Sequence, residues 1–144
     1  MIEYKKMDLS HIKEVAQIEG LCFPNRFGEK TFLRELDNKI AYYIVAISHG
    51  KVAGYGGLWN ICGEADITDI ATHPDFRRMG IGEGILDELI KYCKENKITK
   101  INLEVRESNI PAQKLYEKLG FIYDGQRKNY YENRETAILM SLNL

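Results

Sequence analysis

The fold of this chain is decided by residues 65–84, which read ADITDIATHPDFRRMGIGEG. The run 64–72 is strand-like, Pro74 ends it, and a glycine-containing turn follows at 77–84. An apolar helical face then begins, made of Ile81, Ile85, Leu86, Leu89, Ile90 and Cys93. This order of strand, glycine turn and amphipathic helix predicts a right-handed crossover that packs on a sheet.

The rest of the chain supplies further strands and helices on both sides of this unit. Short connections at 49–50 and 62–63 predict an antiparallel meander upstream. Helical patterns follow Asp8, recur around 32–36 and run from Asn109 to Gly120. The remaining predicted strands are 2–7, 41–48, 51–59, 100–105, 121–127 and 135–142. We therefore predict one α+β domain over 1–144, with a mixed, largely antiparallel central sheet of about seven strands and helices on both faces.

Composition describes an ordinary globular protein. Of its 144 residues, 44% are hydrophobic and 28% charged, and the formal net charge is −1. The charges are interspersed, so we expect neither a nucleic-acid nor a membrane partner. Cys22, Cys62 and Cys93 lie far apart without a metal-ligand spacing, which predicts reduced thiols and no metal. The first residues lack an apolar signal-like run, so we expect a cytoplasmic protein.

The turn at 77–84 has the features of a phosphate-binding site. A helix N-terminus presents free backbone N–H groups and a partial positive charge. Glycines allow a ligand to approach the backbone closely, and Arg77 and Arg78 add positive charge. A Walker A loop would need Gly-Lys-Ser/Thr, and a Rossmann turn would need GxGxxG; neither is present. The alternative is a loop whose glycines only let helix and sheet pack.

The same turn resembles the (Arg/Gln)-x-x-Gly-x-(Gly/Ala) signature of the GNAT superfamily of acetyltransferases, through Arg77, Gly80 and Gly82. The resemblance implies that acetyl-CoA is bound as co-substrate along the turn, which also contains Arg78, Met79 and Ile81. It implies too that backbone groups of the preceding strand hold the pantetheine arm, at positions Ile70, Ala71 and Thr72. Plain strand pairing is the alternative for those three residues.

Acetyl transfer to an amine needs a base, a donor for the developing oxyanion and a proton for the leaving thiolate. Glu104 is a candidate base, because its side chain points away from the apolar face of the strand 100–105. Tyr116 lies on the following helix, and both side chains could reach a common cleft. Glu64 and Asp66, on the strand before the glycine turn, are rival bases.

Residues 103–121, LEVRESNIPAQKLYEKLGF, closely resemble the bacterial ribosomal-protein-alanine N-acetyltransferase family, a GNAT branch that acetylates the N-terminus of a small-subunit ribosomal protein. The resemblance implies Glu104 as general base, Tyr116 as general acid and Asn109 as a CoA contact. Each has an alternative role: a solvated strand residue, a half-buried core aromatic and a helix N-cap, respectively.

The acceptor side is expected at 23–32 and 127–131, two segments that also fit this family. Asn25 and Arg26 depart from its usual Trp and Ser, and Glu83 stands where a basic residue is common. We predict an acetyl-CoA-dependent N-acetyltransferase acting on a primary amine, with the N-terminal peptide of a protein, possibly ribosomal, as partner. A small-molecule amine as acceptor, or a non-catalytic acyl-CoA-binding module, remain the alternatives.

Overall fold

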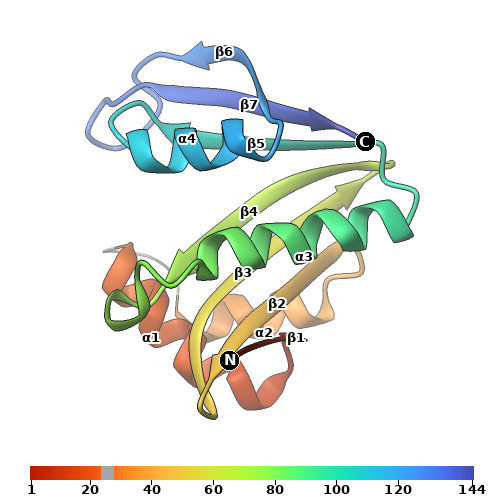
Figure 1. Ribbon diagram of the computed structural model, residues 1–144, viewed down its shortest axis with the longest axis vertical. Coiled ribbons are helices and arrows are strands. Elements are labelled where there is room, and N and C mark those ends of the chain that lie inside the picture. Colours follow the sequence, from red (N-terminus) through yellow and green to blue (C-terminus); the bar gives the residue numbers. More distant parts are fainter. Residues whose placement is uncertain (24–27) are drawn as a thin grey trace.

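The strands of this protein form a single seven-stranded sheet in the order β1-β2-β3-β4-β5-β7-β6 (Figure 1). The computed structural model describes residues 1–23 and 28–144. All neighbouring strands pair antiparallel except β4 and β5, which are parallel. The strands are β1 (Ile2–Lys6), β2 (Ala41–Ser48), β3 (Lys51–Ile61), β4 (Glu64–Thr72), β5 (Lys100–Arg106), β6 (Ile122–Arg127) and β7 (Ala137–Asn143). The predicted mixed, largely antiparallel sheet is confirmed, with ends shifted by at most two residues.

Helices cover both faces of this sheet, as predicted. They are α1 (Ile12–Cys22), α2 (Glu29–Asp37), α3 (Ile81–Glu95) and α4 (Ile110–Lys118), with short 3₁₀ turns η1 (Leu9–His11) and η2 (Pro74–Phe76). Figure 1 shows α3 in front of strands β2–β4, while α1 and α2 lie behind them. In the ranges 1–23 and 28–144, no helix is both long and apolar enough to cross a bilayer.

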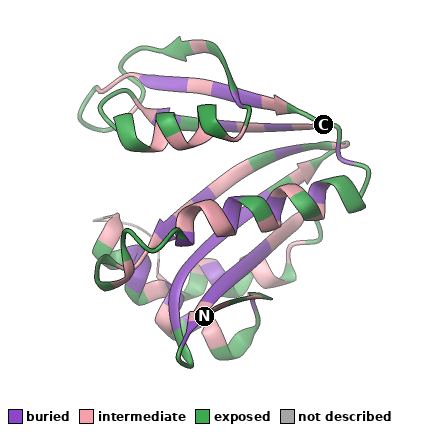
Figure 2. Ribbon diagram, viewed as in Figure 1, coloured by how far each residue is buried: buried purple, intermediate pink, exposed green. Residues whose placement is uncertain are grey.

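Two hydrophobic cores correspond to the two faces. The apolar stripe of α3 is fully buried at Ile85, Leu86 and Leu89, and it packs with β5 and β7 residues in one cluster. The other cluster joins α1 and α2 to the opposite side of β2 and β3 through Phe32 and Tyr55. Figure 2 shows this burial along β2–β4, whereas β6 at the edge of the sheet is largely exposed. The central strands are therefore packed between two apolar layers, one on each face.

Two helix-start details differ from the sequence interpretation. Asp8 caps the 3₁₀ turn η1 rather than α1 directly, because its side chain accepts the N–H of Ser10 at 2.8 Å. Gly84, counted above in the glycine turn, lies inside α3 and serves packing: a Cβ there would collide with the Tyr4 ring of β1. Asn109 does cap α4, by accepting the N–H of Ala112 at 3.3 Å.

Candidate active site

A cleft opens in the middle of the sheet because β4 and β5 pair over only three residue pairs, from Glu64 with Lys100 to Asp66 with Asn102. Beyond that point the two strands diverge, as Figure 1 shows. A cavity of about 760 Å³ fills the gap between them. Among the described residues, no other strand pairs with the facing edges of the diverging parts. A ligand can therefore pair with backbone groups there, although Cys22 Sγ already lies 3.4 Å from Thr72 O.

The two rival bases lie where β4 and β5 are still paired. Asn102 Nδ2 lies 3.2 Å from Glu64 Oε1 and 3.3 Å from Asp66 Oδ1, so one amide serves both carboxylates. Asp66 lines the cavity, but it does so where the strands are still paired. Glu104 lies beyond the last strand pair. It is therefore better placed than Asp66 to accept a proton from a ligand that binds between the diverged strands.

A β-bulge at Thr68 shapes the β4 wall. Gly57 of β3 pairs with Asp69 and Leu58 pairs with Ile67, which leaves Thr68 as the extra residue. Its Oγ1 lies 2.8 Å from the Tyr43 hydroxyl, which donates its one proton to Glu35 Oε2 at 2.8 Å.

The direction of this chain of hydrogen bonds follows from the donors available. Because the Tyr43 proton is already used on Glu35, Thr68 must donate to Tyr43. Trp59 Nε1 donates to the same Glu35 oxygen at 2.7 Å. Thr68 therefore faces the cavity as a hydrogen-bond acceptor, and the wall beneath it is fixed from α2.

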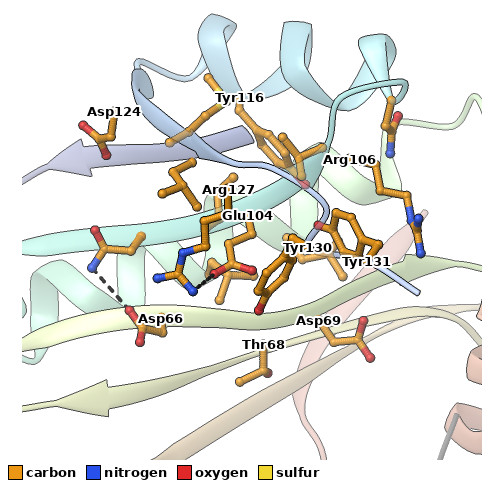
Figure 3. A pocket seen from close by; sticks show the side chains of 18 of the residues that line it. Asp66, Thr68, Asp69, Glu104, Arg106, Tyr116, Asp124, Arg127, Tyr130 and Tyr131 are labelled. Atoms are coloured by element: carbon orange, nitrogen blue, oxygen red, sulfur yellow. Dashed lines mark hydrogen bonds and ion pairs between the residues drawn. The ribbon is translucent and has the colours of Figure 1, made fainter. Parts of the chain in front are cut away.

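Glu104 projects into the cavity from the middle of β5, while Leu103 and Val105 are buried on the other face of the strand. Its Oε1 lies 3.8 Å from Arg127 Nη1, and its side chain is 34% exposed (Figure 3). The Tyr130 phenol lies close to the Glu104 carboxylate, whose attraction for the phenol proton raises the pKa of Tyr130. The Glu104 carboxylate is partly exposed and its ion pair with Arg127 is long, so it can accept a proton from a ligand.

Tyr116 reaches the same cavity from α4 (Figure 3). Its ring packs against Phe121, with ring centres 5.8 Å apart. Burial, with a smaller effect of Tyr131, raises the pKa of Tyr116 to about 12. The phenol is thus a proton-bearing hydrogen-bond donor at neutral pH.

The loop between β6 and β7 closes the cleft with two tyrosines. Tyr130 and Tyr131 both line the cavity, and their rings meet edge to face with centres 5.2 Å apart. Burial is the largest of the causes that raise the pKa of Tyr131. Phe23 and Trp59 line the cavity as well. Residues 24–27 of the predicted acceptor segment lie outside the described residues.

A second recess, of about 260 Å³, lies at the start of α3. Gly80 precedes the helix in the left-handed conformation (φ 74°), and Arg78 is also left-handed (φ 65°). The first residues of α3, Ile81, Gly82 and Glu83, line the recess, and the N–H groups at the start of a helix have no acceptor within it. Lys118 Nζ of α4 lies 2.8 Å from Glu83 Oε1, and this ion pair offsets the negative charge of Glu83 beside the turn.

The predicted cofactor residues divide between the two hollows. Those that line the smaller recess are Thr72, Arg77, Arg78, Gly80, Ile81 and Gly82. Ile70 and Asn109 line the larger cavity. Met79 is exposed at 53% and lines neither hollow, and Ala71 is buried against the α1 side. Any contact by Ala71 would have to come from its backbone.

Several residues that line the large cavity were not identified from the sequence. Thr68, Trp59, Arg106 and Asp124 are among them. A lone tryptophan at the end of a strand was a weak signal for Trp59. Nothing in the local sequence indicates the bulge that places Thr68. Across residues 1–23 and 28–144, no group of three or more His, Cys, Asp or Glu side chains is arranged to hold a metal ion.

Comparison with known proteins finds relatives over nearly the full chain. The model of the Acetyltransferase (GNAT) family matches residues 12–121. A Bacillus subtilis protein named as a candidate ribosomal protein bS18-alanine N-acetyltransferase is 40% identical over 138 residues, covering 94% of this chain and 91% of that protein. The Escherichia coli K12 enzyme named ribosomal protein bS18-alanine N-acetyltransferase is 35% identical over 135 residues, covering 92% and 86%.

A solved structure shows the same fold. The crystal structure of the ribosomal-protein-alanine N-acetyltransferase from Escherichia coli superposes with a TM-score of 0.91 at 31% sequence identity. The match covers 99% of this chain and 94% of that one.

Proposed function

The chain belongs to the acetyltransferase (GNAT) family and is an N-acetyltransferase, and from this premise we propose that it transfers acetyl from acetyl-CoA to the N-terminal α-amino group of a protein. The relatives named above act on a ribosomal protein, and the acceptor proposed here is likewise the N-terminus of a small-subunit ribosomal protein. The observation that carries the proposal is the opened junction of β4 and β5, where Glu104 and Tyr116 line one cavity.

The recess at the start of α3 fits the diphosphate of acetyl-CoA. Gly82 lies in the first turn of the helix, and a Cβ built there meets only Thr72 Oγ1, at 3.9 Å. Protein packing therefore does not require glycine at this position, whereas a phosphate resting on the backbone would. Arg77 and Arg78 line the recess and supply positive charge.

The remaining contacts to acetyl-CoA are proposed along β4 and at the start of α4. Backbone groups of Ile70, Ala71 and Thr72 follow the bulge on β4, and Asn109 caps α4 at the rim of the large cavity. When bound, acetyl-CoA supplies an acetyl group activated as a thioester.

Glu104 is proposed as the general base. An α-amino group has a pKa of about 7.7–8.0 and must lose a proton to attack, so a carboxylate in the cleft raises the share of neutral amine at the reaction centre. Arg127 lies beside one oxygen of Glu104, and the partly exposed carboxylate can take the proton directly or through water.

Tyr116 is proposed as the acid on the leaving-group side. Its pKa of about 12 lies above that of an ordinary thiol, about 8.5, so complete proton transfer to a thiolate is uphill. A hydrogen bond from the phenol to the charged sulfur is favourable, and solvent can complete the protonation. The phenol therefore stabilises departing charge and remains protonated between turnovers.

The positions of the cysteines favour direct attack of the amine on acetyl-CoA over a mechanism with an acetylated cysteine. Within 1–23 and 28–144, none of the three cysteines lines the 760 Å³ cavity. Cys93 is fully buried, and burial raises the pKa of its thiol to about 11, which keeps it un-ionised.

Acetyl transfer to a peptide panel tests the proposal. The panel contains Ala-, Ser- and Met-starting peptides, an internal-lysine peptide and spermidine, assayed with the wild type, Glu104→Gln and Tyr116→Phe. We expect turnover on an N-terminal peptide and its loss in both variants. Turnover on spermidine alone would replace the protein acceptor by a small amine, and full activity of both variants would remove their catalytic roles.

A further inference from the structure

The β6–β7 loop that carries Tyr130 and Tyr131 has its own support at the end of β5. Arg106 Nη2 binds Glu132 Oε1 at 2.9 Å, and its Nη1 binds Asn133 and Glu135 at 3.1 and 3.3 Å. The loop thus receives three hydrogen bonds from one guanidinium. Because a guanidinium is planar and permanently charged, such a fork fixes both distance and orientation.

The face of the same guanidinium is also used. Its central carbon lies 4.0 Å from the centre of the Tyr131 ring, a cation–π contact. Figure 3 shows the Tyr131 ring between Arg106 and Glu104. Arg106 therefore contacts the Tyr131 ring directly while it also binds the loop that carries this ring.

The other end of the loop is tied to the turn that starts α4. Glu135 Oε2 accepts the N–H of Ser108 at 2.7 Å, and the N–H of Glu107 donates to Thr136 O at 3.0 Å. Only 17% of the Glu135 side chain is exposed, so solvent competes weakly for its ion pair with Arg106. Arg106 and Glu135 thus form a clamp between β5 and the loop.

From this clamp we propose that Arg106 is a positioning residue for the acceptor peptide: it holds Tyr130 and Tyr131 against the cleft and acts through them rather than on the reacting atoms. The inference rests on the acceptor site proposed above. It assigns the acceptor, not acetyl-CoA, as the substrate whose binding depends on the Arg106 side chain. The recess for the diphosphate is built from other residues, and the proposed CoA contact Asn109 bonds the backbone oxygen of Arg106, not its guanidinium.

Kinetics with an N-terminal peptide at saturating acetyl-CoA test this role. For Arg106→Ala we expect the peptide KM to rise about tenfold or more, with kcat changed less than about threefold, because lost positioning contacts weaken ground state and transition state alike. Binding of CoA, measured by calorimetry, should stay within about twofold. A fall in kcat at unchanged KM, or weaker CoA binding, would overturn the proposal.

Two further variants separate positioning from a general loss of structure. Arg106→Lys keeps the charge but loses the fork, so it should recover only part of the peptide KM. Glu135→Gln should raise KM in the same direction, and its effect should not add to that of Arg106→Ala, because both break one clamp. Additive effects would contradict the clamp. Lys94→Ala, on the exposed last turn of α3, is the control with wild-type constants expected.

Limited cleavage by trypsin tests the clamp without any acceptor peptide, so its result does not depend on the proposed function. Trypsin can cleave the loop after Lys128 and Arg134. We expect Arg106→Ala to speed cleavage at these two bonds by about tenfold. Without the Arg106 contacts, the loop opens more often and exposes both bonds to the protease. Unchanged cleavage rates would refute the support of the loop. If the wild type acetylates no N-terminal peptide, the proposed acceptor fails while the cleavage result still decides whether Arg106 holds the loop.

Discussion

The two hollows of this enzyme are built in different ways. The recess at the start of α3 is lined almost entirely by residues 72–83, and left-handed backbone at Arg78 and Gly80 shapes it. The larger cleft collects side chains from β3, β4, β5, α4 and the β6–β7 loop. The first site is thus a property of local backbone, whereas the second exists only when distant segments are packed. Changes at the first should affect CoA. Changes at the second should affect the acceptor and the chemical step, except at Ile70 and Asn109, which line the larger cleft and are proposed to contact CoA.

Glu104→Gln should give the largest effect of the changes considered. Removing a general base typically costs about 100-fold to 10,000-fold in rate, and Gln keeps the size of the side chain. We expect kcat/KM for the peptide to fall in this range while CoA binding is retained.

Asp66→Asn is the matched change where β4 and β5 are still paired and Asn102 already binds the carboxylate. A rate loss in Asp66→Asn as large as that in Glu104→Gln would move the base to β4 and break the proposed division of roles.

Gly82→Ala and Gly84→Ala should separate ligand contact from packing. At Gly82 the protein leaves room for a methyl group, so we expect CoA affinity to fall about tenfold through one lost backbone–phosphate contact. The free energy of unfolding should stay equal or rise by about 0.5–1 kcal/mol, as alanine favours the helix.

At Gly84 the opposite pattern is expected. The added methyl would strike Tyr4, and overpacking of this kind costs about 1–3 kcal/mol. Calorimetry for CoA and urea unfolding for both variants check the pair. If Gly82→Ala binds CoA like the wild type, the recess does not hold the diphosphate.

Tyr116→Phe should change how stability depends on pH. The folded-state pKa of about 12 lies above the unfolded value near 10, so the neutral phenol contributes stability that is complete below pH 10 and is lost as pH rises toward 12. Between pH 9 and pH 12, the free energy of unfolding should therefore fall less steeply in the variant than in the wild type. An identical slope in both proteins would show that Tyr116 titrates normally.

Lys118→Ala should have the smallest effect. The ion pair with Glu83 is exposed, so its loss should weaken CoA binding by less than about fivefold, by leaving a negative charge beside the recess. Glu83→Gln should act in the opposite direction and tighten binding. Both changes should fade at high salt, because exposed charges are screened. Tighter binding in Lys118→Ala would mean that the pair hinders the ligand.

The same contrast explains what the sequence could predict. The strands, the apolar stripe of α3 and the glycine turn are local patterns, and the structure confirms the sheet and helices that they indicated. The family and relatives confirm an acetyltransferase and set aside a non-catalytic binding module. The roles of Glu104, Tyr116 and the CoA contacts remain predictions that the geometry accommodates.

What the sequence could not predict depends on register and distance. The bulge at Thr68 arises from how β4 aligns with Gly57 and Leu58 of β3, and no turn residue marks it. The clamp joins Arg106 to Glu135 across 29 positions of the chain. The packing role of Gly84 also depends on Tyr4, which is remote in sequence. Local patterns carry no information about such contacts.

The short junction of β4 and β5 has a consequence for solubility. Where these strands separate, the protein carries two strand edges inside a sheet, and unpaired edges usually invite aggregation with other chains. Here both edges face a cavity of about 760 Å³ whose walls carry charged and aromatic side chains. Because the two edges face each other across this cavity, a folded sheet from another molecule would have to displace its walls to reach them, whereas a single extended segment would not. The protein thereby keeps an edge that can pair with a single strand while remaining shielded from edge-to-edge stacking.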